Sequence, residues 1–361
     1  MKTKLVYVVV STDKDIYLEQ AWVSAFSAKY HNPTAKVVFV TDEDTYNGII
    51  GTERKNVMSV VDELVPVHID GKLSNMKRSR WIKTNLRNLI DGDFLFVDTD
   101  TVVTGDLSAV DGFTMSIGAV YDLHCTFDKF PYAVGIIKQM KTVFGCIPNH
   151  GTSYFNSGTI YAKDDDISRS FFTLWHDNWL HSCTKGVATD QLSMMKTCDS
   201  LHCVSPMSGD YNCQVLGSIQ YLYTAKIVHF FNAKWNDNTL CPFFGNDVYR
   251  QVKKDRGISG EVKNMVLHCK ELFVSPSIPI SGNDVDIWNS QAFNLLRWLN
   301  NNSKNLYRSV VFVARCAMFV IKKLPLCFIN KSGGVKCNTS VRLEVCGVAL
   351  RCCLEAERRA A

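Results

Sequence analysis

Two closely spaced aspartates follow a short apolar segment and are suited to binding a divalent cation. Residues 94–97 are apolar, aromatic or β-branched, which is typical of a buried strand, and they lead directly into Asp98, Thr99 and Asp100. In an extended chain, side chains two residues apart point to the same side, so both carboxylates could share one ligand. Carboxylate oxygens suit Mg²⁺ or Mn²⁺, which usually also bind substrate phosphates. A turn with two solvated aspartates is the alternative, but the strand-like residues 101–103 that follow favour the metal site.

The buried-strand pattern recurs in the first hundred residues, with helical patterns between its occurrences. Strands are expected at residues 5–10, 36–40, 64–67 and 94–97, and helices at residues 17–32 and 79–90. Alternating strands and helices predict an α/β domain with a mostly parallel sheet, and ligands of such sheets bind at the carboxyl ends of the strands. Ser11, Thr12 and Asp13 follow the first strand and are therefore expected near Asp98 and Asp100. Alternatively, they serve only as the N-cap of the first helix.

Basic residues follow one face of the helix expected at residues 79–90. Arg80, Lys83 and Arg87 recur at helical spacing, and taken by themselves Arg80 and Lys83 could be a solvated helix face. Later elements are less regular. Strands are expected at residues 116–121, 154–161 and 221–228, and helices at residues 171–181 and from 192 to 195, whereas residues 127–146 have no clear pattern.

Three motifs in this later part carry polar groups that could serve a site. Asn156, Ser157 and Gly158 interrupt an apolar strand, where a glycine often marks the close approach of a backbone or a ligand. Asp190 and Gln191 open a helix, for which Asp190 is also a suitable N-cap. The last of the motifs follows the strand expected at residues 221–228 and comprises His229, Lys234 and Trp235.

Composition describes an ordinary globular protein with a large core. The chain has 361 residues, of which 46% are hydrophobic and 21% charged. Its 14 cysteines do not form paired C-x-x-C motifs, so thiolate metal binding is not expected and a reduced, cytoplasmic setting fits best. The first residues resemble the start of a signal peptide, but the apolar segment is short and no small-residue cleavage site follows, so we expect a core strand.

The positive charge is concentrated at the C-terminal end. Residues 304–361 contain 11 Lys/Arg and 3 Asp/Glu, which leaves 29 basic and 32 acidic residues in the rest of the chain. A nucleic-acid groove in the main domain is therefore not indicated. Lys304, Arg308, Arg315 and Lys322 fall along one helix face beside apolar residues. The apolar segment of such a helix is too short to span a bilayer. The helix would suit the surface of an anionic membrane. Alternatively, it packs on the main domain.

The ordered set of motifs resembles the nucleotide-sugar-dependent glycosyltransferases of the GT-A fold, most closely glycosyltransferase family 8. The resemblance covers roughly residues 4–240. In chain order, it rests on Ser11-Thr12-Asp13 with Tyr17, Arg80 with Lys83, Asp98-Thr99-Asp100, Asn156-Ser157-Gly158, Asp190-Gln191, and His229 with Lys234-Trp235. Each motif alone is weak, and their order makes the resemblance specific. It implies a Rossmann-like, mostly parallel sheet flanked by helices, with the basic helical C-terminal tail outside it.

The resemblance also implies roles for individual residues. The D-x-D carboxylates and a late histidine would hold the metal, which here are Asp98, Asp100 and His229. Because histidine suits Mn²⁺ better than Mg²⁺, manganese is favoured and magnesium is the alternative. The nucleotide sugar would be bound by Ser11, Thr12, Asp13, Tyr17, Arg80, Lys83, Asp98, Thr99, Asn156, Ser157 and Lys234. Against the family's H-x-x-G-x-x-K-P-W motif, the chain has Asn232 for the glycine, one residue fewer before Lys234, and no proline before Trp235.

Asp190 and Gln191 are the candidate catalytic residues. By the resemblance, Asp190 binds hydroxyls of the donor sugar, Gln191 lies near the anomeric centre, and the anomeric configuration is retained. Retention by double displacement needs a carboxylate nucleophile, about 5 Å from an acid/base partner in hydrolases. The sequence offers no clear second carboxylate, and a glutamine is a poor nucleophile. A front-face reaction, in which the leaving phosphate takes the proton of the acceptor, is therefore favoured.

These inferences give one expected function and two rivals. The expected function is metal-dependent transfer of a hexose from a nucleotide diphosphate sugar, with UDP preferred, to a glycan or lipid-linked glycan. A non-catalytic nucleotide-sugar binding or scaffold protein would bind the metal without turnover. A sugar nucleotidyltransferase would need a glycine-rich phosphate loop after the first strand, and residues 11–15 contain no glycine. The expected organisation is a GT-A nucleotide-sugar transferase domain at residues 1–250, a helical acceptor-side extension at 251–303, and a basic amphipathic tail at 304–361. The expected location is the cytoplasm, peripheral on the inner face of the membrane if the tail binds lipid.

Overall fold

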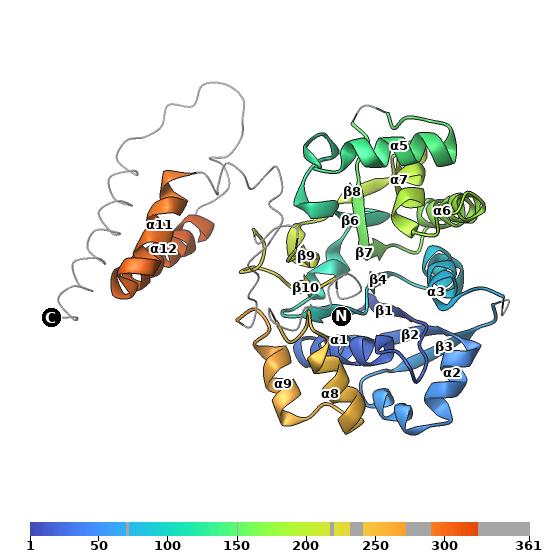
Figure 1. The fold of residues 1–361 in the computed structure, drawn as a ribbon, viewed down its shortest axis with the longest axis horizontal. Coiled ribbons are helices and arrows are strands. Elements are labelled where there is room, and N and C mark those ends of the chain that lie inside the picture. Colours follow the sequence, from blue (N-terminus) through green and yellow to red (C-terminus); the bar gives the residue numbers. More distant parts are fainter. Residues whose placement is uncertain (70–71, 150, 217–219, 232–240, 272–289, 324–361) are drawn as a thin grey trace. The chain divides into compact units, whose positions relative to one another are not determined.

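The computed structural model describes residues 1–69, 72–149, 151–216, 220–231, 241–271 and 290–323 (Figure 1). The chain divides into two compact units, Met1–Val285 and Asp286–Ala361. Lys234, Asn232 and Trp235 lie outside the described residues, as does the tail after residue 323. The candidate site can therefore be examined for the other predicted residues, all of which belong to the first unit.

A seven-stranded sheet forms the centre of the first unit. In spatial order its strands are β3 (Glu63–Val67), β2 (Val37–Asp42), β1 (Lys4–Val9), β4 (Phe94–Val97), β7 (Phe155–Ala162), β6 (Ile117–Tyr121) and β8 (Val204–Pro206). Neighbouring strands from β3 to β4 are parallel, β7 is antiparallel to both β4 and β6, and β8 is parallel to β6. The predicted α/β fold with a mostly parallel sheet is confirmed.

Helices cover both faces of this sheet, because its strands are apolar on both sides (Figure 1). Side chains of β1 alternate between two cores, with Leu5 and Tyr7 in one and Val6 and Val8 in the other. The first core receives side chains from α1 (Tyr17–His31), α2 (Glu43–Ile50), α8 (Asp247–Asp255) and α9 (Gly260–Leu267). The second receives side chains from α3 (Asn75–Thr84), α4 (Leu86–Leu89), α6 (Asp166–Thr184) and α7 (Asp190–Leu201).

The segment with no clear pattern in the sequence contains a helix, α5 (Ala133–Phe144), which packs through Met140 and Val143 into a third, smaller apolar cluster. Short 3-10 helices complete the first unit, at Glu53–Ser59, Ser108–Gly112, Asp122–His124, Phe127–Lys129 and Gly209–Tyr211. The second unit contains α11 (Gln291–Asn302) and α12 (Lys304–Lys323). Among the described residues, no helix is both long and apolar enough to cross a bilayer.

The prediction of a single helix at residues 79–90 was wrong. Its place is taken by α3, which begins earlier because the side chain of Ser74 caps its first turn, and by the short α4, with a break at Asn85. The break also divides the predicted basic stripe. Arg87 is buried and donates a hydrogen bond to the Gly92 carbonyl at 2.8 Å, so it supports a turn, whereas Arg80 and Lys83 remain on α3.

A second, three-stranded sheet carries the metal motif. Its order is β5 (Thr101–Val103), β10 (Ile227–His229) and β9 (Cys213–Gln214). The strand expected at residues 221–228 was too long, since β10 begins only at Ile227. Residues 221–224 form a turn, and the backbone N–H of Lys226 donates to the Asp210 carbonyl at 2.7 Å. In the antiparallel pair of β10 with β5, His229 is opposite Thr101. This register brings His229 beside the two aspartates.

Candidate functional site

A pocket of about 330 Å³ opens at the carboxyl ends of β1 and β4. The predicted site residues that line it are Tyr17, Arg80, Lys83, Asp98, Thr99 and Asp100. The rest of the lining is Val8, Val10, Gln20, Asn75, Met76, Ser79 and Phe96. Tyr17 is 43% exposed at the start of α1, so its ring is available to a ligand. The prediction that a site forms at this edge of the sheet is consistent with the position of the pocket.

Four charged side chains form a compact network on one side of the pocket, two of them cations and two carboxylates. Lys83, almost fully buried, has its Nζ 2.9 Å from Asp190 Oδ2 and 3.2 Å from Asp98 Oδ1. Arg80 Nε lies 3.1 Å from Asp190 Oδ1, and Ser157 Oγ donates to Asp190 Oδ2 at 2.9 Å. Burial raises the pKa of the Asp190 carboxyl, but the charges of Lys83 and Arg80 outweigh it and hold that pKa well below its usual range. Asp190 is therefore ionised at neutral pH.

Asp190 is the first residue of α7, and Thr189 occupies the N-cap position. The alternative in which Asp190 is the N-cap was wrong. Its carboxylate is instead directed to the two cations of α3, while its backbone carbonyl accepts a hydrogen bond from the indole of Trp175 at 3.0 Å. The adjacent Gln191 is half-buried, and within the described part of the chain its Nε2 is buried without a hydrogen-bond partner.

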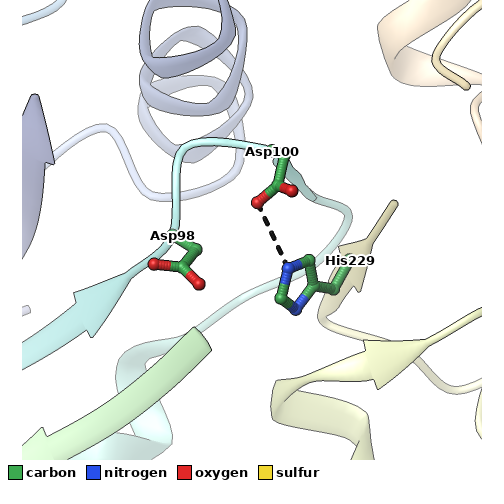
Figure 2. A group of neighbouring side chains, drawn as sticks. All are labelled: Asp98, Asp100 and His229. Atoms are coloured by element: carbon green, nitrogen blue, oxygen red, sulfur yellow. Dashed lines mark ion pairs between the residues drawn. The ribbon is translucent and has the colours of Figure 1, made fainter. Parts of the chain in front are cut away.

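Asp98, Asp100 and His229 face one another across the end of β4 (Figure 2). One ligand atom from each lies within 4.8 Å of the others, and His229 Nε2 is 3.2 Å from Asp100 Oδ1. Asp98 to Asp100 form a turn, and the extended geometry expected from the sequence was wrong. One oxygen of each carboxylate nevertheless lies close to the other. The antiparallel pairing of β5 with β10 brings His229 to the same turn.

This group suits a divalent cation. Two carboxylate oxygens and one imidazole nitrogen form a mixed oxygen and nitrogen donor set, which Mn²⁺ accepts and Mg²⁺ accepts less well. Both aspartates are partly accessible from the pocket, whereas His229 is 2% exposed. An ion held here would therefore face the pocket with its remaining coordination positions.

His229 is closely confined by its surroundings. Its ring stacks on Phe231 with a centroid distance of 4.1 Å, and a Cβ placed on Gly158 would be 2.4 Å from its Cε1. Only a glycine fits at this point of β7, and the group that approaches it is the imidazole side chain of His229 and not the backbone or ligand expected from the sequence. Asn156, on the same strand, does not line the pocket and hydrogen-bonds to Asp122 and Asn212 behind it.

The loop after β1 is organised by a residue that the sequence analysis did not select. Asp15 accepts hydrogen bonds from Ser11 Oγ at 2.6 Å and from both the backbone N–H and the hydroxyl of Thr12 at 2.8 and 2.9 Å. Ile16 is at the N-cap position of α1, so none of Ser11, Thr12 and Asp13 is its N-cap residue. Ser11 Oγ nevertheless accepts a hydrogen bond from the backbone N–H of Leu18 in the first turn at 3.3 Å.

None of the three residues selected in this loop lines the pocket at the end of β4, although Val10 and Tyr17 on either side of the loop do. Asp13 is exposed and lines a different pocket, of about 300 Å³, between α1 and α8. Ser11 and Thr12 line neither pocket. Ser11 is buried, accepts from Arg54 at 2.6 Å and is already saturated with hydrogen bonds. Of the predicted nucleotide residues in this part of the chain, only Tyr17 reaches the pocket with the aspartates.

Comparisons with known proteins gave structural likenesses alone. No protein-family model matches the chain, and no curated protein sequence matches it. Among solved structures, the apo form of the bifunctional glycosyltransferase WbbM is 13% identical with a TM-score of 0.47. The match covers 71% of this chain and 52% of the WbbM chain. The chain thus spans about half the length of WbbM.

Two further likenesses are to smaller enzymes. The galactosyltransferase LgtC, in complex with donor and acceptor sugar analogues, is 13% identical with a TM-score of 0.48, covering 73% of this chain and 99% of LgtC. The glycosyltransferase GlyE of Streptococcus pneumoniae is 14% identical with a TM-score of 0.44, covering 76% of this chain and 66% of GlyE.

Proposed function

We propose that this protein is a metal-dependent glycosyltransferase that moves a hexose from a nucleotide diphosphate sugar, with UDP as the preferred nucleotide, to a glycan or lipid-linked glycan. The observation that carries the proposal is the convergence of Asp98, Asp100 and His229 beside a pocket that also contains Arg80 and Lys83. A cation site next to fixed positive charge suits a diphosphate. The order of the motifs in the sequence supports the same assignment.

Each polar group of the pocket has a role in this reaction. Asp98, Asp100 and His229 would hold Mn²⁺, or Mg²⁺ in its place, and the ion would stabilise the negative charge of the leaving diphosphate. Arg80 is one-third exposed and can reach the same phosphates. Tyr17 is available to the nucleotide. Thr99, between the aspartates, lines the pocket, and Lys234 completes the set of residues proposed to bind the diphosphate.

The charge network supports retention by a front-face reaction. A nucleophilic carboxylate needs a free oxygen, but Asp190 shares one oxygen with Arg80 and the other with Lys83 and Ser157. Its lowered pKa makes it a weak nucleophile as well. We therefore assign Asp190 to holding the two cations in place and, through the acceptor site that remains on Oδ1 beside Arg80, to binding a hydroxyl of the donor sugar. Gln191, whose amide nitrogen is buried and unpaired within the described residues, would contact the sugar near the anomeric centre.

The test is release of UDP from a panel of UDP-sugars with Mn²⁺, with and without EDTA, for the wild type and Asp100→Ala. Turnover of one sugar that is lost in EDTA and in the variant is the expected result. Metal-dependent binding without release, even with glycan acceptors added, would favour a non-catalytic nucleotide-sugar binding protein. Release of pyrophosphate from UTP and a sugar phosphate would favour a nucleotidyltransferase. Absence of metal and nucleotide binding would contradict all three.

A membrane surface is proposed as a further partner of the second unit. The sequence from residue 290 to 323 has no acidic residue and six Lys/Arg. Several large apolar side chains of α11 and α12 are more than half exposed, namely Leu295, Trp298, Leu306, Phe312, Met318 and Phe319. A basic and apolar surface of this kind suits the interface of an anionic bilayer on the cytoplasmic side.

Liposome sedimentation tests this partner. The wild type is expected to bind vesicles that contain phosphatidylserine and to remain unbound with phosphatidylcholine alone, and a Trp298→Asp/Phe312→Asp variant should lose the binding. Equal recovery of wild type and variant with both vesicles would instead indicate that these helices dock on protein.

A further inference from the structure

Behind the metal group lies a buried row of amides, of which the sequence motifs pointed to Asn156 but not to Asn212. Asn212, which is fully buried, has its Oδ1 2.9 Å from His229 Nδ1 and its Nδ2 2.9 Å from Asn156 Oδ1. Asn156 in turn donates from its Nδ2 to Asp122 Oδ1 at 2.9 Å. The four side chains connect the histidine of the metal group to a carboxylate on the far side of β7.

The direction of every hydrogen bond in this row is determined by its chemistry. The backbone N–H of Gly158 can only donate, and it points to Asn156 Oδ1 at 2.9 Å. That oxygen is therefore an acceptor, and the other end of the Asn156 amide is the NH₂ that the Asp122 carboxylate accepts. Asn212 must then turn its own NH₂ to Asn156 Oδ1. Its carbonyl oxygen remains for His229.

An amide oxygen can only accept a hydrogen bond, so Asn212 requires a proton on His229 Nδ1. The Asp100 carboxylate beside Nε2 also only accepts, so the two partners compete for the single proton of a neutral ring, and Asn212 at 2.9 Å lies nearer to its nitrogen than Asp100 at 3.2 Å. The lone pair of the neutral ring is then on Nε2, the nitrogen that lies 3.2 Å from Asp100 Oδ1 and faces the pair of aspartates. We propose that Asn212 is a positioning residue that fixes the Nδ1–H tautomer of His229 and thereby presents Nε2 as a metal ligand. This inference rests on the proposed metal site.

The geometry leaves the histidine few alternatives. Rotation of the ring is opposed by the backbone at Gly158, which the imidazole approaches so closely that no side chain would fit there, and by the stacked ring of Phe231. A histidine that binds a metal usually donates its other N–H to such a partner, and loss of the partner typically lowers metal affinity about 10- to 100-fold. Here the partner is a neutral amide, fixed through Asn156 by a backbone N–H. Its orientation therefore does not depend on the metal.

Two variants separate this role from simple packing. Asn212→Leu keeps the approximate volume and removes the acceptor, whereas Asn212→Asp keeps an acceptor oxygen for His229 Nδ1. Mn²⁺ binding, measured by electron paramagnetic resonance in the presence of UDP, is expected to weaken about 10- to 100-fold in Asn212→Leu and to be largely retained in Asn212→Asp. Asn178→Leu, which removes a hydrogen bond to Thr197 on α6 and α7 outside the pocket, is the matched control and should bind Mn²⁺ like the wild type.

A second readout needs neither metal nor activity. In metal-free protein labelled with ¹⁵N-histidine, at a pH where the ring is neutral, nuclear magnetic resonance should show an Nδ1–H tautomer for His229, identified by its loss in His229→Gln. An Nε2–H tautomer in the wild type would overturn the inference without any variant at Asn212. So would Mn²⁺ binding by a folded Asn212→Leu that equals the wild type. If the wild type binds no Mn²⁺ but has the Nδ1–H tautomer, lost in Asn212→Leu, the metal site is wrong and the role of Asn212 in fixing the ring stands.

Discussion

The two sides of the candidate site hold their functional groups by different means. On the side of α3 and α7, Lys83 and Arg80 are held by the carboxylate of Asp190. On the side of β7 and β10, His229 is held by the neutral amides of Asn212 and Asn156. The first arrangement balances charge against charge. The second contains formal charge only at its ends, in Asp122 and in the aspartates of the metal group.

This difference has consequences for substitution. Removing one partner of a buried ion pair leaves an uncompensated charge, which strongly destabilises the fold. Removing one member of a neutral row leaves an unsatisfied polar group, whose effect on stability is smaller. We therefore expect changes on the side of α3 to reduce stability and activity together. Changes on the side of β10 should affect mainly the affinity for metal.

Lys83→Met should have the largest effect. It leaves Asp190 buried without its nearest cation, so the free energy of unfolding should fall by about 3–5 kcal/mol. Sugar transfer should fall by about 10²–10³-fold because the positive charge beside the diphosphate is lost. Urea unfolding and UDP release measure the two effects. The double variant Lys83→Met/Asp190→Leu removes both charges and should regain much of the stability but none of the activity; an active double variant would contradict the assignment.

Gly158→Ala should have a smaller effect on stability and a clear one on metal binding. The added Cβ would be 2.4 Å from His229 Cε1 and 2.8 Å from Asn156 Oδ1, so the imidazole must move. We expect a loss of about 1–3 kcal/mol in stability and about 10- to 100-fold in Mn²⁺ affinity. Gly135→Ala, on α5 with no atom within 4 Å of the added Cβ, is the control and should leave metal binding unchanged. Equal Mn²⁺ affinities in the two variants would contradict the close confinement of His229.

The sequence predicted the acidic side of this site better than the row of amides. The aspartates follow an apolar strand, and the cations recur at helical spacing, so both are visible in local patterns. Asn212 lies between a 3-10 helix and the two residues of β9, and nothing in its neighbourhood marks it. It is brought to His229 only by the pairing of β9 with β10. Strand pairing of this kind depends on contacts between distant segments, which a single sequence does not reveal.

The boundaries of the elements were less predictable for the same reason. The buried strands of the large sheet were recognisable because they are continuously apolar. The break of the helix at Asn85 and the turn at residues 221–224 were not, because they depend on hydrogen bonds of Arg87 with Gly92 and of Lys226 with Asp210. Likewise, the hydrogen bonds that Asp15 accepts from Ser11 and Thr12 were not predicted, because the sequence pattern drew attention to Asp13 and not to Asp15.

Acid should weaken the charged side in a predictable direction. The pKa of Asp190 is lower in the folded protein than the value of about 3.9 expected in the unfolded chain, so its ion pairs stabilise the fold above that value. This contribution is lost as the pH falls from about 4 through the folded-state pKa. The midpoint of urea unfolding should therefore fall more steeply in this range for the wild type than for Asp190→Asn. Parallel pH profiles would show that Asp190 does not keep its ion pairs.

Arg80→Lys should have the smallest effect and separates the two uses of charge on α3. Arg80 is one-third exposed, so the change in stability should stay below about 1 kcal/mol. A lysine keeps the charge but not the planar geometry, and UDP release should fall about tenfold, as for loss of one charge-assisted hydrogen bond. Arg78 lies two residues away on the same helix, where it pairs with the buried Asp42 at 2.7 Å and does not line the pocket. Arg78→Lys should therefore lower stability more than Arg80→Lys and leave UDP release unchanged. A loss of UDP release in Arg78→Lys as large as in Arg80→Lys would contradict the assignment of Arg80 to the phosphates of the donor.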